Sequence, residues 1–122
     1  MSVAFVFPGQ GSQGVGLLSS LLGRPEVDAL VARADAALGE PLLSRVIAEG
    51  PAEELALTTW TQPAMLLAGM ANLAAWRAEG GPEPDFVAGH SLGEYTALVA
   101  AGSLELDTAV KLVRLRAQAM QE

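Results

Sequence analysis

Two short apolar runs indicate β-strands in this chain. Val3 to Phe7 combines β-branched and aromatic residues and ends at Pro8 and Gly9. Asp85 to Gly89 is a second short run of this kind, and it follows a loop rich in proline and glycine. Apolar runs without a polar alternation are typical of strands buried on both faces, as in parallel sheets. We therefore expect two buried strands.

Between and after these runs, apolar residues recur every three to four positions, which indicates amphipathic helices. The clearest predicted helix runs from Pro25 to Leu38 and stops at Gly39. The other predicted helices are Pro41 to Glu49, Ala64 to Trp76 with Thr61 as its cap and Pro63 in its first turn, Leu92 to Ala101 before Gly102, and a last helix capped by Asp107. The last helix has no stop signal before Glu122.

The order strand, helices, strand, helix predicts an α/β fold with a parallel sheet. Two strands are too few for a stable sheet of that kind. Because the last helix also lacks a stop signal, we expect the chain to be truncated. Its length of 122 residues and hydrophobic share of 51% predict one compact unit.

Composition excludes several classes of function. The net charge of -7 argues against a nucleic-acid-binding protein. The absence of cysteine and the single histidine exclude disulfides and make a metal site improbable. The longest uncharged run, between Glu54 and Arg77, holds too many polar residues to cross a membrane, and the N-terminus carries no targeting pattern, so we expect a cytoplasmic protein.

The strongest chemical motif is Gly89-His90-Ser91-Leu92-Gly93, which matches G-x-S-x-G between a predicted strand and a predicted helix. Such a sharp turn exposes the serine hydroxyl as a nucleophile. The helix N-terminus points its amides at the same place, so the Leu92 N–H is expected to stabilise an oxyanion. The alternative is a chance match in a glycine-rich chain, in which Ser91 merely caps a helix.

The loop after the first strand also matches G-x-G-x-x-G, from Gly9 to Gly14. A dinucleotide-binding fold would need a second strand about 20 residues further on, ending in an acidic residue. This chain has the predicted helix Pro25 to Leu38 there instead, and no lysine precedes Lys111 to form a phosphate-binding P-loop. We expect the loop to supply a second oxyanion donor, the Gln10 amide.

Arg116 is a further candidate site residue, as a binder of a carboxylate. In the last helix, it falls on the same predicted stripe as the apolar residues Ala109, Leu112, Val113 and Met120. A guanidinium on such a stripe needs an anionic partner, and its two-pronged geometry suits a carboxylate. An internal ion pair or a side chain that reaches back to solvent is the alternative.

Three motifs together resemble the malonyl-CoA:acyl carrier protein transacylases of fatty acid synthesis. They are Phe7-Pro8-Gly9-Gln10-Gly11-Ser12-Gln13, Thr61-Gln62-Pro63-Ala64 and Gly89-His90-Ser91-Leu92-Gly93-Glu94-Tyr95. Arg116 followed by Met120-Gln121 is similar to the next block of that family. The resemblance runs from the first strand to the last residue.

The resemblance implies a role for each motif residue. Ser91 accepts the acyl group, and the Gln10 and Leu92 amides form the oxyanion hole. Arg116 pairs with the malonyl carboxylate, Gln62 lines the substrate site, and His90 is carried over as a substrate-site residue and not as the base. The implied reaction is a two-step transfer from malonyl-CoA to the phosphopantetheine thiol of acyl carrier protein, with no metal and no permanently bound cofactor.

The resemblance also implies what is missing. Residues 1–122 would form the N-terminal portion of an α/β-hydrolase-like large subdomain with a short parallel sheet flanked by helices. The family's ferredoxin-like small subdomain and catalytic histidine would lie beyond this chain. One local departure is Ala117, which stands where the family usually has glycine.

Other functions remain open at this stage. An acyltransferase domain of a polyketide synthase shares these motifs, whereas a serine hydrolase of the α/β-hydrolase type shares only the sharp turn at Ser91. The chain alone is also expected to be inactive for lack of the histidine. It would then be an inert fragment or one half of a split protein whose C-terminal portion is a second chain.

Overall fold

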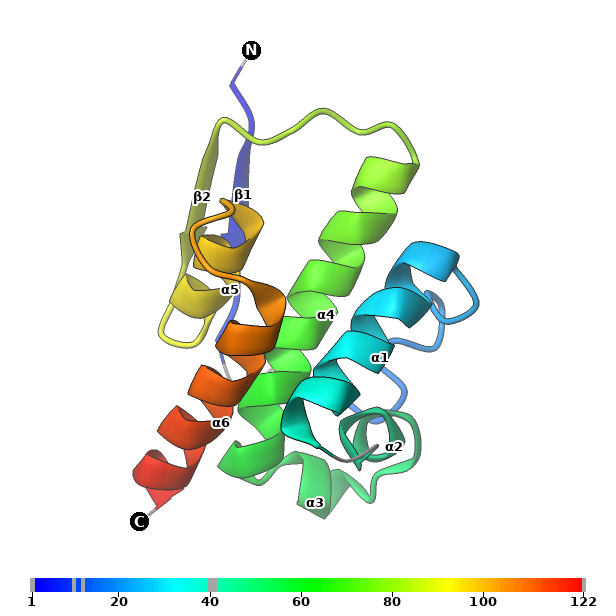
Figure 1. Ribbon diagram of the computed structural model, residues 1–122, viewed down its shortest axis with the longest axis vertical. Coiled ribbons are helices and arrows are strands. Elements are labelled where there is room, and N and C mark those ends of the chain that lie inside the picture. The colour runs from blue at the N-terminus through cyan, green and yellow to red at the C-terminus, as the bar shows by residue number, and fades with distance from the viewer. Residues whose placement is uncertain (1, 10, 12, 40–41, 122) are drawn as a thin grey trace.

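The computed structural model describes residues 2–9, 11, 13–39 and 42–121, and it shows a helix-rich α/β arrangement (Figure 1). The elements in chain order are β1 (Ala4–Phe7), α1 (Pro25–Leu38), α2 (Leu42–Glu49), α3 (Ala52–Leu55), α4 (Thr58–Ala78), β2 (Phe86–Gly89), α5 (Gly93–Ala100) and α6 (Leu106–Gln121). Helix α4 runs through the centre, with the two strands and α5 on one side and α1 to α3 on the other.

The two strands form a short parallel sheet. β1 pairs with β2 so that Ala4 lies opposite Phe86 and Phe7 lies opposite Gly89. Both strands therefore end at the same edge, and the segments that follow them start side by side. This register brings the glycine loop after β1 next to the turn that holds Ser91.

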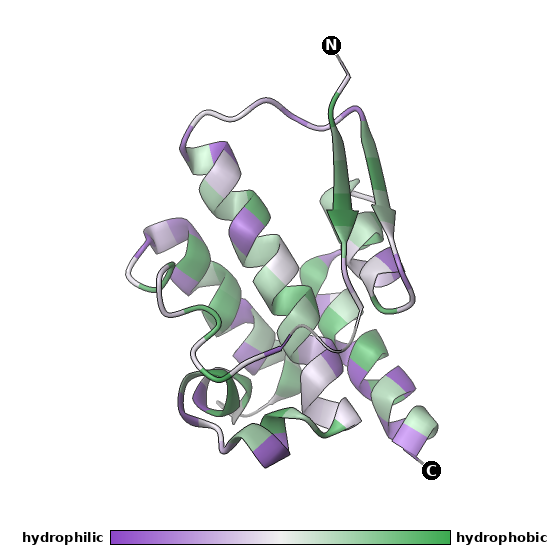
Figure 2. Cartoon of the chain, turned by 180° about the vertical axis from the view of Figure 1, so that it is seen from behind, coloured by the Kyte–Doolittle hydropathy of each residue, from purple (hydrophilic) through white to green (hydrophobic). Residues whose placement is uncertain are grey.

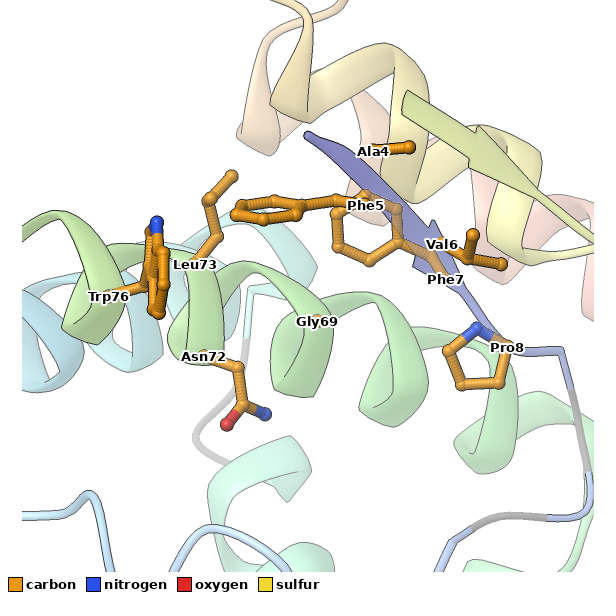
Figure 3. Close-up of a pocket in the computed structure, with 9 residues that line it drawn as sticks. All are labelled: Ala4, Phe5, Val6, Phe7, Pro8, Gly69, Asn72, Leu73 and Trp76. Carbon is orange, nitrogen blue, oxygen red and sulfur yellow. The ribbon is translucent and has the colours of Figure 1, made fainter. Parts of the chain in front are cut away.

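The expectation that both strands are buried on both faces is wrong. Along β1 the exposed fraction falls to 7% at Phe7 but is 74% at Val6, and Phe86 in β2 is 68% exposed. Phe5 and Phe7 point towards α4, across a pocket of about 390 Å³ that Leu73 and Trp76 also line (Figure 3). In Figure 2 the two strands lie on the outside of the molecule. An apolar run shows that its side chains favour burial. A strand is buried on both faces only where helices or other elements cover both faces of the sheet.

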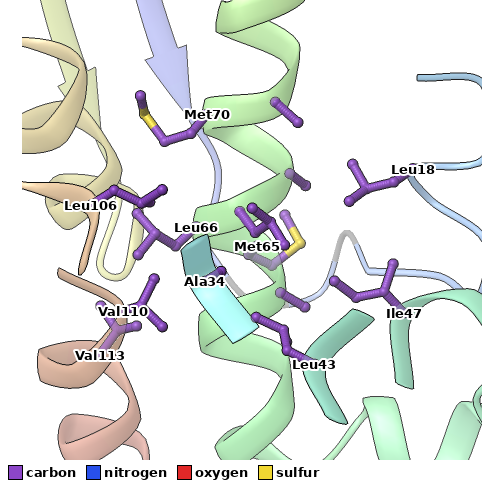
Figure 4. Packing of buried hydrophobic residues seen from close by; sticks show 14 of the residues in the cluster. Leu18, Ala34, Leu43, Ile47, Met65, Leu66, Met70, Leu106, Val110 and Val113 are labelled. Atoms are coloured by element: carbon purple, nitrogen blue, oxygen red, sulfur yellow. The ribbon is translucent and has the colours of Figure 1, made fainter. Parts of the chain in front are cut away.

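The core lies among the helices. Side chains from α4 and α6 face each other in it, among them Leu66, Val110 and Val113 (Figure 4). On the other side of α4, Val27 of α1 and Leu43 and Ile47 of α2 are buried with at most 2% exposure. Helix α4 contributes most of its residues to this core, which explains why its sequence is apolar nearly all round.

Helix α1 has the bounds predicted from its periodicity, whereas α4 begins earlier than expected. It starts at Thr58, so Pro63 lies inside the helix and Thr61 does not cap it. Thr61 is fully buried, and its hydroxyl donates to the carbonyl oxygens of Leu55 and Leu57, the latter at 3.0 Å. A buried threonine that bonds the preceding turn satisfies its hydroxyl without being a cap.

The remaining differences are small. Helix α6 begins at Leu106, so Asp107 lies in its first turn, and the short helix α3 was not predicted. None of the helices within the described residues is long and apolar enough to cross a bilayer.

Candidate active site

Ser91 stands at the sharp turn between β2 and α5. Its φ of 56° is the positive value of the left-handed region, and among the described residues other than glycine it alone has one. The side chain is exposed. A serine held in this region between a strand and a helix is the geometry that presents a hydroxyl as a nucleophile.

Two glycines make this turn possible by close approach. A Cβ added at Gly89 would collide with the carbonyl oxygen of Gly93, and one added at Gly93 would collide with the carbonyl oxygen of Phe7. The turn is closed by hydrogen bonds from the Gly93 amide to the His90 oxygen, 2.9 Å, and from the Glu94 amide to the Ser91 oxygen, 3.1 Å. The G-x-S-x-G spacing therefore reflects backbone contact on both sides of Ser91.

The Leu92 amide lies at the start of α5, where helix N–H groups have no partner within the helix. In the described part of the chain it has no hydrogen-bond acceptor, and the Leu92 side chain is fully buried. An amide in that state is free to receive an acceptor from a ligand.

Gln10 lies outside the described residues, so the expected oxyanion role of its amide is not tested. Its neighbour Gly9 is described. A Cβ added at Gly9 would lie 2.9 Å from the His90 oxygen and 3.7 Å from the Ser91 Cβ. Gly9, at the start of the loop after β1, therefore packs against the Ser91 turn.

Arg116 reaches Ser91 from α6. Its Nη2 donates to Ser91 Oγ at 3.1 Å, and its Nη1 donates to Gln62 Oε1 at 2.7 Å. Gln62 is fully buried in α4, and its Nε2 donates to Met120 Sδ at 3.2 Å. The Arg116 guanidinium also lies over the Tyr95 ring, 5.4 Å from its centroid. Three predicted site residues, Ser91, Arg116 and Gln62, are thus in direct contact.

The stripe on which Arg116 was predicted to lie is wrong in part. Leu112 and Met120 are 40% and 56% exposed, and Arg116 is half-buried. The buried stripe of α6 consists of Leu106, Ala109, Val110, Val113 and Ala117. Because α6 has apolar residues on several sides, periodicity alone does not select which of two overlapping stripes packs against α4.

His90 is exposed, and its amide donates to the Phe7 oxygen at 3.2 Å. Among the described residues, the Arg116 guanidinium is the one side chain that hydrogen-bonds the Ser91 hydroxyl, and no histidine or carboxylate does so. The described residues also hold no cluster of three or more side chains suited to a metal ion.

Sequence reasoning assigned no role to Tyr95 or to the Met120 sulfur. Tyr95 contacts Arg116 and Met120 contacts Gln62, pairs from different helices that no local sequence pattern indicates. The pocket between β1 and α4 is lined by neither Ser91 nor Arg116, so it is separate from this site.

Comparisons with known proteins agree with this geometry. The acyl transferase domain model matches residues 4–122. The malonyl CoA-acyl carrier protein transacylase of Escherichia coli strain K12 is 51% identical over 98% of this chain, which covers 38% of that protein.

Solved structures give the same picture. The acyl-carrier-protein S-malonyltransferase from Burkholderia pseudomallei is 55% identical, with a TM-score of 0.95, over 99% of this chain and 39% of that one. A malonyl-transacylase complex with a type II polyketide synthase acyl-carrier protein gives a TM-score of 0.92 at 46% identity, over 99% and 39% of the two chains. The chain thus spans about two fifths of the length of these relatives, and it belongs to the acyl transferase domain family.

Proposed function

We propose that this chain carries the acyl-accepting half of an enzyme that transfers a malonyl group from coenzyme A to the phosphopantetheine thiol of acyl carrier protein. The observation that carries the proposal is the contact between Arg116 and Ser91, 3.1 Å from Nη2 to Oγ. It places a permanent cation beside a nucleophile, which suits an acyl group that ends in a carboxylate. The relatives named as malonyl transacylases support the same substrate.

The reaction proceeds in two transfers. Ser91 Oγ attacks the thioester carbonyl as a base takes its proton, and the tetrahedral intermediate collapses with loss of the coenzyme A thiol, which is protonated. The carrier-protein thiol then attacks the seryl ester and releases Ser91 Oγ, which regains a proton. The Leu92 and Gln10 amides stabilise the oxyanion of both intermediates, and each such donor is worth about 3 kcal/mol of barrier.

The general base comes from residues outside this sequence. His90 follows the strand directly and is the neighbour of Ser91, so its ring is poorly placed to take the hydroxyl proton. We infer that the C-terminal portion of such an enzyme, in the same polypeptide or as a second chain, completes the site with a histidine. In this proposal residues 1–122 are the N-terminal portion of the large subdomain, the protein is cytoplasmic, and malonyl-CoA binds as a substrate, with no permanently bound cofactor.

Arg116 selects the acyl group. A malonyl ester on Ser91 carries its carboxylate within reach of the guanidinium that now bonds Ser91 Oγ and Gln62 Oε1. An acetyl ester offers no anion to replace those contacts. Gln62 holds the guanidinium in place, because its fully buried amide oxygen accepts from Nη1. His90 borders the substrate site from the Ser91 turn.

The test is to incubate the chain with malonyl-CoA, alone and together with the C-terminal portion of a relative, and to look for malonyl-Ser91 by mass spectrometry. We expect labelling that needs the second chain and is lost in Ser91→Ala. In the completed enzyme, Arg116→Ala should lower malonyl transfer by at least about tenfold while sparing acetyl transfer, since the lost interaction is a charge-assisted one. Equal losses for both acyl groups contradict the assignment of Arg116.

The same chemistry serves polyketide synthesis. The similar malonyl-transacylase in complex with a polyketide carrier protein favours an acyltransferase of polyketide synthesis as the second candidate function. Comparing fatty acid and polyketide carrier proteins as acceptors separates the two. A serine hydrolase would instead release free acid from simple esters without any carrier thiol. No labelling of Ser91 under either condition would identify the chain as inert.

A further inference from the structure

A second arginine of α6 also reaches across to α4. The Arg114 Cζ lies 4.3 Å from the centroid of the Trp60 ring, and Trp60 is only 9% exposed. The Arg114 Nε is buried and has no hydrogen-bond acceptor within the described residues. The guanidinium lies over an aromatic face, a favourable contact for a partly buried cation.

Arg114 and Arg116 flank the buried stripe of α6 on opposite sides. At about 100° of turn per residue, they lie roughly 80° to either side of the line through Val113 and Ala117. Arg114 contacts Trp60, whereas Arg116 contacts Gln62 two residues further along α4. Helix α6 is thus held to α4 on both flanks of its packed face.

The packed face of α6 next to the arginines is formed by small and medium-sized side chains. Its buried residues next to the arginines are Ala109, Val110, Val113 and Ala117. Helices pack by fitting ridges of side chains into grooves, and alanine and valine form shallow ridges. The first turn of α6 is held to α1 by the ion pair between Arg33 and Asp107, 3.1 Å. In the second half of α6, the flanking side chains Arg114 and Arg116 restrain the rotation.

We propose that Arg114 is a positioning residue: by stacking on Trp60 it fixes the rotation of α6, and so aims the Arg116 guanidinium at Gln62 and Ser91. A rotation that carried Arg114 off the ring would swing Arg116 in the same sense, away from its partners. The inference about the position of Arg116 does not rest on the proposed function. Its effect on acyl selection rests on the proposed function.

The first experiment measures the Arg116 contact directly in this chain. Hydrogen bonds to Gln62 and Ser91 should slow solvent exchange of the Arg116 Nη protons, which NMR resolves. In Arg114→Leu, which keeps an apolar side chain over Trp60, we expect that exchange to accelerate about fivefold to tenfold, the equivalent of one cation and aromatic contact. Lys111→Leu removes an exposed cation from the same helix and should leave it unchanged.

A second pair of variants tests the same contact from the α4 side. Trp60→Phe keeps an aromatic face and should largely retain slow exchange of the Arg116 Nη protons. Trp60→Leu should accelerate that exchange as much as Arg114→Leu does. If Arg114→Leu does not fold, this pair decides the question. Unchanged Arg116 exchange in Trp60→Leu or in Arg114→Leu overturns the proposal and leaves Arg114 with a purely structural role.

The consequence for catalysis is tested in the enzyme completed with the C-terminal portion. Arg114→Leu should lower the preference for malonyl over acetyl transfer about fivefold to tenfold, with acetyl turnover unchanged. A loss shared equally by both acyl groups contradicts the catalytic part of the inference. If the parent transfers no acyl group at all, the proposed function fails, while the exchange experiment still decides the role of Arg114.

Discussion

The helical side of the molecule and the sheet side differ in how completely their apolar side chains are buried. Around α4 the core is closed, with Leu66, Val110 and Val113 fully buried. In the sheet, Val6 and Phe86 are mostly exposed, and the adjoining turn holds Ser91 in a strained conformation. Stability thus resides chiefly among the helices, and the proposed chemistry lies at the edge of the open sheet. Helix α6 belongs to both, since it packs in the core and reaches Ser91 through Arg116.

The largest effect should come from filling the close approach in the Ser91 turn. Gly89→Ala places a methyl group against the Gly93 carbonyl, a backbone atom that cannot move without opening the turn. We expect a loss of more than about 4 kcal/mol in the free energy of unfolding, or local unfolding of the turn. Urea denaturation followed by circular dichroism measures the first, and amide hydrogen exchange at residues 89–95 measures the second.

The matched control is Gly80→Ala, at a glycine with a φ of 82° and open space around it. There the cost should be only that of a left-handed alanine, about 1 to 2 kcal/mol. Gly89 is not among the glycines with a positive φ, so a cost there no larger than at Gly80 would show that the turn accommodates the methyl group.

Truncation in the helical core should have the next largest effect. Leu66→Ala removes a fully buried side chain of α4, and the cavity left behind should cost about 3 kcal/mol. Thermal unfolding detects this as a clear fall in Tm. A cost below about 1 kcal/mol would mean that the core around α4 collapses into the space, and the contrast between the two regions would weaken.

The smallest effect should come from the outer side of the sheet. Val6→Thr keeps the β-branched shape and changes a side chain that is 74% exposed, so the free energy of unfolding should shift by less than about 0.5 kcal/mol. The same substitution at Val113, which is fully buried, provides the comparison by urea denaturation and should cost at least about 1 kcal/mol. Similar losses at both positions would show that the outer side of the sheet is covered in solution.

Local sequence patterns located most helices and strands correctly, but they predicted less well how far each element is buried. The helix Pro25 to Leu38 was correct because its periodicity and terminal glycine act within the segment itself. The two strands were located within a residue, but their exposure depends on neighbouring elements that no local pattern specifies. The early start of α4 was missed because Pro63 is usually found in a first turn, not in a helix interior.

The candidate site shows the same division. The position of Ser91 in a strand-to-helix turn followed from the motif and its flanks. Its contact with Arg116, 25 residues away, and the contact of Arg116 with Gln62, 54 residues away, needed the fold, although the family resemblance had named all three residues. The stacking of Arg114 on Trp60 left no signal in the sequence, because an arginine on a helix flank is most often solvated. The roles of all the candidate site residues stay predictions: those of Ser91, Arg116 and Gln62 as well as those of Leu92, Gln10 and His90.

The positive φ at Ser91 limits how this position can change. A left-handed backbone costs most residues about 1 to 3 kcal/mol, and glycine almost nothing. Mutation to glycine would therefore relax the turn while discarding the hydroxyl, so selection for a sturdier fold and selection for reactivity pull this position in opposite directions. In the proposed function, the nucleophile therefore occupies a position at which glycine would give the more stable fold.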